Sequence, residues 1–312
     1  MKFKSGQKKN TGILYIVSTP IGNLEDITLR AIRILKEVDL IAAEQVRHSK
    51  ILCRHYDIKT KLTSYNQHNR KAKGFELIRK LEFGHNIALI TCAGTPGISD
   101  PGGRLISQVL KKDIKVSPVP GVSAVITGLS VSGLKIDRFV FLGFLSSRPG
   151  KRRKELRSLE SESRTMVFFE APHRITAMLE DLMETLGDRE IVLLRELTKV
   201  YEEIKQGTIS SLLTQIAAER IRGEYTLVVS GKENNKEQQL IDKDTQNKIK
   251  RMLGHEKMGV KDIASKLSRE CGMTYRKVYK ECLSIKRNTN NSMDIPSQKR
   301  REDFRTVANV RH

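Results

Sequence analysis

The sequence predicts two α/β domains followed by a small, basic helical region, and three observations support this prediction. From residue 11 to residue 231, short apolar runs alternate with segments of helical periodicity, which is typical of βαβ units and a mostly parallel sheet. Gly- and Pro-rich turns follow several of the apolar runs. After Gly231 the apolar runs become sparse, and Lys and Arg outnumber Asp and Glu by 20 to 11.

The first domain is predicted over residues 11–145, behind a polar segment 1–10 that we expect to be disordered. Strands are expected at 13–17, 39–43, 87–91, 114–118 and 139–142. Helices are expected at 26–38, 71–82, 103–112 and 124–131. Asp26 is a suitable N-cap for the first of these helices, because apolar residues recur at helical spacing from Ile27 to Val38.

The second domain is predicted over residues 146–231. The basic segment 148–154 interrupts the alternation and is interpreted as the linker between the domains. Strands are then expected at 165–169, 190–195 and 225–229, with helices near 173–186 and 208–222 between them.

The C-terminal part is predicted to be a small helical region over residues 232–287 and a basic, disordered tail over residues 288–312. Residues 260–269 and 275–283, separated by a turn at Gly272, resemble a small helix-turn-helix. The tail combines Asn-rich sequence with a basic cluster and has few apolar residues, as is typical of disordered segments.

Charge and cysteine content limit the function classes. A formal net charge of +21 indicates a polyanionic partner, with nucleic acid ahead of an anionic membrane surface. No apolar run approaches the roughly 18 residues needed to span a bilayer, so no membrane association and a cytoplasmic location are expected. The four cysteines lack the spacing of a zinc site, and no metal is expected.

Three Gly- and Pro-rich turns, at 19–23, 94–103 and 120–124, each follow a predicted strand. Parallel strands place such turns along one edge of a sheet, where they can converge on one ligand. The alternative is that they are only tight connections between strands and helices. Neither a G-x-G-x-x-G turn after a strand nor a P-loop is present, so an NAD or ATP site lacks its usual motif.

Five segments in this order resemble the motifs of the tetrapyrrole-methylase superfamily. They are Thr19-Pro-Ile-Gly-Asn-Leu24, Ala43-Glu44 with Arg47-His48, Ala93-Gly-Thr-Pro-Gly-Ile-Ser-Asp-Pro-Gly102, Pro120-Gly-Val-Ser-Ala124 and Phe168-Phe-Glu-Ala-Pro-His-Arg174. The likeness covers about residues 11–231 and is strongest to the bacterial branch that methylates ribose 2′-hydroxyls of small-subunit (16S) ribosomal RNA.

This resemblance implies a cleft between two α/β domains that binds S-adenosylmethionine (SAM). It also implies a homodimer and methylation of a cytidine ribose in the decoding region, with small-subunit ribosomal RNA or the 30S subunit as partner. The expected cofactor-binding residues are Pro20, Gly22, Gly94, Thr95, Pro96, Gly97, Ile98, Ser123, Ala124, Thr127, Phe169 and Glu170.

Methyl transfer is an in-line displacement that depends on positioning the 2′-oxygen, and a base can assist because a ribose hydroxyl is a weak nucleophile. Glu44, Arg47 and His68 are the catalytic candidates. Alternatively, Glu44 caps the following helix or pairs with Arg47. His68 is alternatively an ordinary loop histidine without a catalytic role. Arg47 suits phosphate binding better than proton transfer, because guanidinium stays protonated.

The basic run Lys151, Arg152, Arg153 and Lys154 is predicted to bind RNA phosphates, with a solvated linker as the alternative. The sequence departs from the family pattern at Gln45, Val46 and Cys92, where Asp, Thr and Asp are usual. A catalytically weakened RNA-binding relative therefore remains an alternative, as does methylation of a small tetrapyrrole-like substrate, which the basic charge disfavours.

Overall fold

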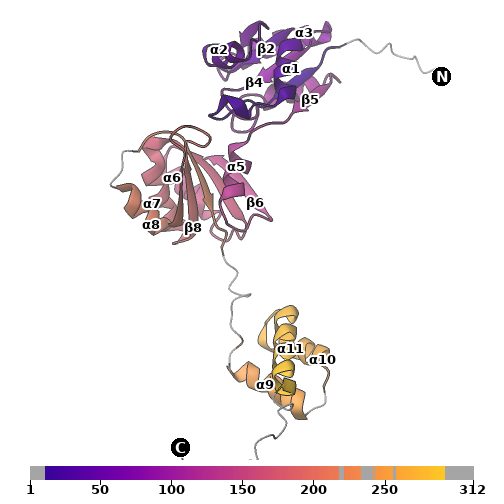
Figure 1. Ribbon diagram of the computed structural model, residues 1–312, viewed down its shortest axis with the longest axis vertical. Helices are drawn as coiled ribbons and strands as arrows, with labels where there is room; N and C mark the ends of the chain where they lie inside the picture. Colours follow the sequence, from indigo (N-terminus) through magenta and orange to yellow (C-terminus); the bar gives the residue numbers. More distant parts are fainter. Residues whose placement is uncertain (1–10, 218–220, 233–240, 242, 256–257, 292–312) are drawn as a thin grey trace, which may run out of the picture. The chain divides into compact units, whose positions relative to one another are not determined.

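The protein is represented here by a computed structural model that describes residues 11–217, 221–232, 241, 243–255 and 258–291 (Figure 1). It consists of two compact units, Met1–Lys232 and Glu233–His312, and each is treated by itself. The first unit contains two five-stranded sheets. The segment predicted to be disordered at 1–10 lies outside the described residues.

The first sheet is parallel and has the strand order β3-β2-β4-β1-β5. Its strands are β1 (Leu14–Val17), β2 (Leu40–Ala43), β3 (Leu62–Ser64), β4 (Ile87–Ile90) and β5 (Val116–Val119). Its helices are α1 (Leu29–Glu37), α2 (Val46–His55), α3 (Arg70–Glu82) and α4 (Gly103–Leu110), with a short 3-10 turn η1 (Leu24–Asp26) before α1.

Helices cover both faces of this sheet, because its strands bury side chains alternately on two sides. Ile41 and Ile90 pack on the face that α1 and α2 cover, and Leu40 and Leu89 pack on the face that α3 and α4 cover. Thr28, not Asp26, is the N-cap of α1, and its hydroxyl accepts a hydrogen bond from the Ala31 amide at 3.1 Å.

The second sheet is mixed, with the strand order β6-β7-β10-β8-β9. Its strands are β6 (Phe139–Phe144), β7 (Thr165–Glu170), β8 (Glu190–Arg195), β9 (Glu203–Thr208) and β10 (Tyr225–Val229). Only β6 and β7 pair in parallel, whereas β10 runs antiparallel to both of its neighbours. The sequence pattern predicts a mostly parallel sheet, which is correct for the first sheet and wrong for the second.

Helices α6 (Pro149–Arg157), α7 (Ile175–Leu186) and α8 (Ile209–Ala217) lie along one face of the second sheet, and α7 follows a short turn η2 (Pro172–Arg174) (Figure 1). Helix α5 (Ala124–Val131) packs on the other face through Val125 and Leu129. The predicted linker at 148–154 is therefore wrong: the chain passes from the first sheet to the second between Val119 and Phe139, and residues 149–157 form a helix of the second layer.

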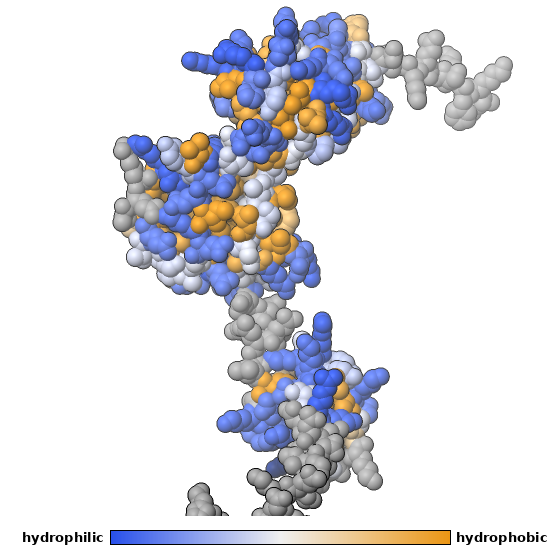
Figure 2. All heavy atoms as spheres, viewed as in Figure 1, coloured by the Kyte–Doolittle hydropathy of each residue, from blue (hydrophilic) through white to orange (hydrophobic). Residues whose placement is uncertain are grey.

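The second unit has three helices in its described part, α9 (Lys243–His255), α10 (Val260–Cys271) and α11 (Tyr275–Asn291), around a core that includes Ile249, Leu267 and Val278. The predicted helix pair is present, with the left-handed Gly272 (φ +64°) ending α10. Residues 288–291 of the predicted tail belong to α11, and residues 292–312 lie outside the described part. Figure 2 shows a mainly hydrophilic surface on the visible face of this unit.

The α/β fold class predicted from the sequence is confirmed. Within the described ranges, no helix combines the length and apolar character needed to cross a bilayer. The same ranges contain no group of three or more His, Cys, Asp or Glu side chains arranged to hold a metal ion.

Candidate active site

The three Gly- and Pro-rich turns meet at the carboxyl ends of β1, β4 and β5. Thr19 and Gly94 exchange two backbone hydrogen bonds of 2.9 and 3.0 Å, which join the first turn to the second. The hydroxyls of Ser18 and Thr95 lie 2.8 Å apart. Gly94 adopts φ +71°, a conformation that costs little only for glycine. The expected convergence of the turns is therefore present in the structure.

A loop between β8 and β9 brings the second sheet to these turns. Gly22 packs so closely on it that a Cβ at this position would lie 2.8 Å from the Leu197 carbonyl oxygen and 2.4 Å from Cγ of Lys199. The Asn23 amide donates to the Thr198 hydroxyl at 3.1 Å. The 19–24 turn therefore needs glycine at position 22 because the loop of the second sheet occupies the space of a side chain.

A cavity of about 490 Å³ opens between the converged turns and the second sheet. We call it the main cavity. Its lining from the first sheet and the following turns includes Ile21, Glu44, Gln45, Cys92, Ala93, Gly94, Thr95, Ile98, Ser99, Asp100, Ser123, Ala124 and Val125. Its lining from the second sheet includes Phe144, Phe169, Glu170, Ala171, Pro172, Leu197, Lys199, Glu224, Tyr225 and Thr226. Its volume is within the usual range for a small-molecule site.

Acidic side chains dominate the polar lining. Glu170 is paired with Arg174 at 3.1 Å, and Glu224 is paired with Lys199 at 2.8 Å. Glu44 accepts a hydrogen bond from the Cys92 amide at 3.3 Å, and neither it nor Asp100 has an ion-pair partner among the described residues. The lining therefore carries an excess of negative charge and favours a cationic ligand.

Burial and the acidic lining raise the pKa values of Asp100 and Cys92. Burial, followed by the charges of Glu44 and Glu224, raises the pKa of Asp100 to about 6. Burial, the charge of Glu44, a hydrogen bond to Glu44 and the charge of Asp100 raise the pKa of Cys92 to about 12. Cys92 is therefore a neutral thiol at pH 7, and Asp100 changes charge near neutrality.

An aromatic wall completes the cavity on the side of the second sheet. The ring of Phe169 lies 5.0 Å from that of Phe141 and 5.6 Å from that of Phe144, between centroids. Phe144 and Phe169 line the cavity. Such a wall suits the face of a planar ring, while the acidic side suits a cation, and SAM carries both groups.

The structure separates the sequence-predicted site residues into three groups. The main cavity is lined by Glu44, Gly94, Thr95, Ile98, Ser123, Ala124, Phe169 and Glu170. Pro20 and Gly22 line an adjoining cavity. Neither of the two cavities described here is lined by Arg47, His68, Pro96, Gly97 or Thr127. Arg47 and His68 are exposed to solvent.

Several residues that line the main cavity are not among those predicted from the sequence. Asp100 stands inside the quoted family motif, and its charge next to a glycine-rich turn was a signal that could have been used. Lys199 and Glu224 come from loops of the second sheet that are distant in sequence from the turns, and no periodicity or motif marks them. Their position follows from the pairing of β10 with β8, which brings the two loops together.

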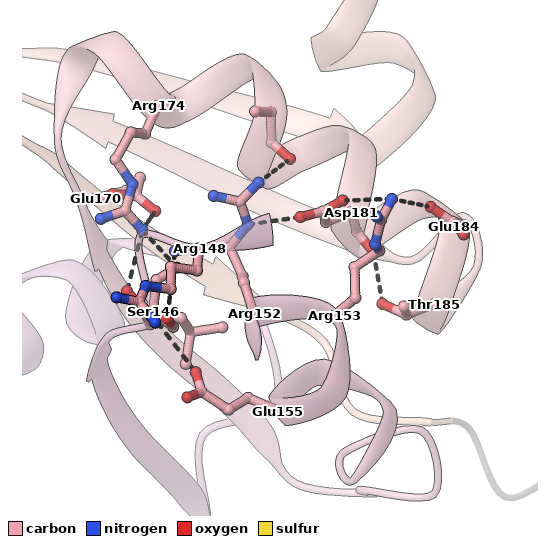
Figure 3. A network of polar contacts seen from close by, with 12 residues as sticks. Ser146, Arg148, Arg152, Arg153, Glu155, Glu170, Arg174, Asp181, Glu184 and Thr185 are labelled. Carbon is pink, nitrogen blue, oxygen red and sulfur yellow. Dashed lines mark hydrogen bonds and ion pairs between the residues drawn. The ribbon is translucent and has the colours of Figure 1, made fainter. Parts of the chain in front are cut away.

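The predicted RNA-binding residues 151–154 lie in helix α6, and two of them are held in ion pairs (Figure 3). The Arg152 side chain is only 3% exposed, and its Nε donates to Asp181 Oδ2 at 2.6 Å. Because the guanidinium is buried in this ion pair, Arg152 does not reach RNA, and its predicted RNA contact is wrong. Arg153 is paired with Glu184 at 3.5 Å, whereas Lys151 and Lys154 are exposed.

Comparison with known proteins is consistent with this arrangement. Residues 13–213 match the model of the tetrapyrrole (corrin/porphyrin) methylases, and the chain belongs to this family. It is 48% identical over 227 residues to "Ribosomal RNA small subunit methyltransferase I" of Bacillus subtilis (strain 168), covering 73% of this chain and 78% of that protein.

A second relative, of Haemophilus influenzae (strain ATCC 51907 / DSM 11121 / KW20 / Rd), bears the same name and is 48% identical over 233 residues, covering 73% of this chain and 82% of that protein. Among solved structures, uroporphyrin-III C-methyl transferase from Thermus thermophilus, complexed with S-adenyl homocysteine, has a TM-score of 0.53 and 18% identity. That likeness covers 70% of this chain and 97% of the solved chain, and it supports the fold.

Proposed function

We propose that this chain is a SAM-dependent methyltransferase that methylates the 2′-hydroxyl of a cytidine ribose in small-subunit ribosomal RNA. The observation that carries the proposal is the main cavity, in which the family's turns meet an acidic and aromatic lining. Relatives 48% identical to this chain are named as small-subunit ribosomal RNA methyltransferases. The net charge of +21 is the charge expected of a protein with an RNA substrate.

The lining residues fit SAM in charge and shape. When bound, SAM supplies an electrophilic methyl group on a positively charged sulfur. Glu44 and Asp100 would stabilise that charge. Phe144 and Phe169 would pack against the adenine, and Thr95 with the 94–98 backbone would form hydrogen bonds to the cofactor. Of the three catalytic candidates, Glu44 is the one that lines the cavity, and we propose it as the group that accepts the ribose proton.

We propose that the partner is small-subunit ribosomal RNA or the assembled 30S subunit, and that the chain acts as a homodimer. Exposed apolar side chains on α5 and β6, including Ile126 and Phe139, offer a surface for contact between the two chains of such a dimer. Exposed Lys151 and Lys154 offer contacts for RNA phosphates.

Two measurements test the function. Isothermal titration with SAM should give binding, and the absence of heat up to millimolar ligand would instead favour a catalytically weakened RNA-binding relative. The full chain should then transfer label from SAM to undermethylated small subunits, and mapping of alkali-resistant ribose positions should locate the methyl group on a 2′-oxygen. Glu44→Gln should lower transfer even at saturating SAM, beyond any weakening of SAM binding. Methyl incorporation into a base would contradict the proposed mechanism.

A further inference from the structure

A second cavity, of about 350 Å³, adjoins the main cavity. Five residues line both: Ile21, Cys92, Ala93, Lys199 and Glu224. The remaining walls of the second cavity come from the 19–24 turn, from helix α2 and from the end of β4. A ligand in the second cavity would therefore lie next to a ligand in the main cavity.

The buried hydroxyl of Ser49 is the distinctive group of the second cavity. Ser49 lies in α2, lines the cavity and is 3% exposed, and its Oγ has no hydrogen-bond partner in the described part of the chain. Ser132 is equally buried, yet its Oγ donates to the Leu129 carbonyl at 2.9 Å. A buried hydroxyl without a partner is costly, and a ligand group that hydrogen-bonds to the Ser49 hydroxyl would remove that cost.

The other walls indicate what kind of group fits beside Ser49. Leu24, Ile51, Leu52 and Ile90 make much of the lining apolar. Lys199 brings a positive charge, but its ammonium is held by Glu196 and Glu224, both at 2.8 Å. The interior is therefore close to neutral, and it suits a flat, uncharged group with hydrogen-bonding edges.

We propose that the second cavity receives the base of the target nucleotide, with the Ser49 hydroxyl hydrogen-bonded to the base edge. This inference rests on the proposed function, because it names the part of the RNA that the site would bind. With the base in the second cavity, the attached ribose lies at the boundary formed by Cys92 and Ala93. A nucleotide in a single-stranded RNA loop can present its unstacked base to such a cavity.

The test uses the full chain loaded with S-adenosylhomocysteine and titrated with cytidine 5′-monophosphate or with ribose 5-phosphate. Wild type should bind the nucleotide more tightly than the sugar phosphate. Ser49→Ala should weaken nucleotide binding about 3- to 10-fold, the effect of one lost neutral hydrogen bond. Ile51→Trp should weaken it more than about tenfold by filling the mouth, because Ile51 lines the cavity and is 57% exposed.

Leu110→Trp is the matched control, since Leu110 is 55% exposed and lies at the end of α4. It should leave nucleotide binding unchanged, and all three variants should keep the wild-type affinity for S-adenosylhomocysteine. Equal binding of nucleotide and sugar phosphate, or wild-type affinity in both Ser49→Ala and Ile51→Trp, would overturn the inference.

Failure of the base subsite and failure of the proposed function give different results. If the nucleotide binds through Ser49 but undermethylated small subunits accept no methyl group, the base subsite stands and the ribosomal activity is wrong. If the subunits are methylated and Ser49→Ala changes neither the nucleotide affinity nor the KM for subunits, the activity stands and the base subsite is wrong.

Discussion

Asp100 should make the affinity for SAM depend on pH while leaving the affinity for S-adenosylhomocysteine nearly constant. Asp100 lines the main cavity, and its pKa is raised to about 6 by burial and by the charges of Glu44 and Glu224. SAM carries a positive sulfur that S-adenosylhomocysteine lacks. The ionised carboxylate therefore favours the first ligand over the second.

The magnitude follows from the ionised fraction of Asp100. With a pKa of about 6, the carboxylate is about nine-tenths ionised at pH 7 and about one-tenth ionised at pH 5. If the cation binds only the ionised form, its apparent affinity falls about tenfold between pH 7 and pH 5. The amino and carboxyl groups of both ligands titrate outside this range, so they contribute little to the difference.

Isothermal titration of the full chain with each ligand at pH 5, 6 and 7 measures this difference. Asp100→Asn should bind SAM more weakly than wild type at pH 7 and should lose the pH dependence. Parallel pH profiles for the two ligands would refute the reasoning. Retention of the wild-type profile by Asp100→Asn would refute it as well, because another group would then be titrating.

Four further outcomes are expected. The folded state binds more protons at Asp100 than the unfolded state between about pH 4 and pH 6, so the contribution of Asp100 to the unfolding free energy of the ligand-free chain should fall as pH rises through that window. Urea titrations at several pH values measure this contribution as the unfolding free energy of wild type minus that of Asp100→Asn, and a difference that does not fall would contradict the raised pKa. Arg152→Met should lower the unfolding free energy by about 3 kcal/mol, since it leaves the Asp181 carboxylate buried with only Arg153 nearby at 3.9 Å. The double variant Arg152→Met/Asp181→Leu should regain most of this loss. A loss below about 1 kcal/mol in Arg152→Met would contradict the buried pair. Lys151→Glu and Lys154→Glu should reduce both RNA affinity and its salt slope in filter binding between about 50 and 200 mM salt, and an unchanged slope would exclude α6 as an RNA contact. The thiol of Cys92, with its pKa raised to about 12, should react with iodoacetamide at pH 8 no faster than that of buried Cys53 in peptide mass mapping, and rapid labelling would show that Cys92 ionises more readily.

Most strands of the first sheet were predicted correctly from the sequence alone. Four of its strands have enough apolar residues to be recognised, and parallel strands buried on both faces read as apolar runs such as Ile87–Ile90. The short β3 and the polar helix α2 were missed, because three residues carry little pattern and α2 buries only Ser49, Leu52 and Cys53. The helix after the Ala-Glu motif is thus visible mainly through its tertiary contacts.

The second layer was harder to predict for a physical reason. Helix α6 is strongly basic, and its sequence was therefore interpreted as a linker. Arg152 of this helix is nevertheless buried, because Asp181 of α7 neutralises its charge. That partner lies 29 residues away, and a sequence pattern gives no sign of the pairing. Strand β9 alternates polar and partly buried residues at a sheet edge, and its register on β8 was likewise decided by tertiary contacts.

The sequence by itself determined the family, the α/β class and the convergence of three turns, because Gly and Pro constrain the backbone locally and parallel strands bring their turns to one edge. Only the tertiary structure decided which carboxylates share the cavity, that Arg152 is buried and that the Ser49 hydroxyl is buried without a partner among the described residues. These properties depend on distances between residues far apart in sequence: the charges of Glu44 and Glu224 act on Asp100 because the two sheets face the same cavity.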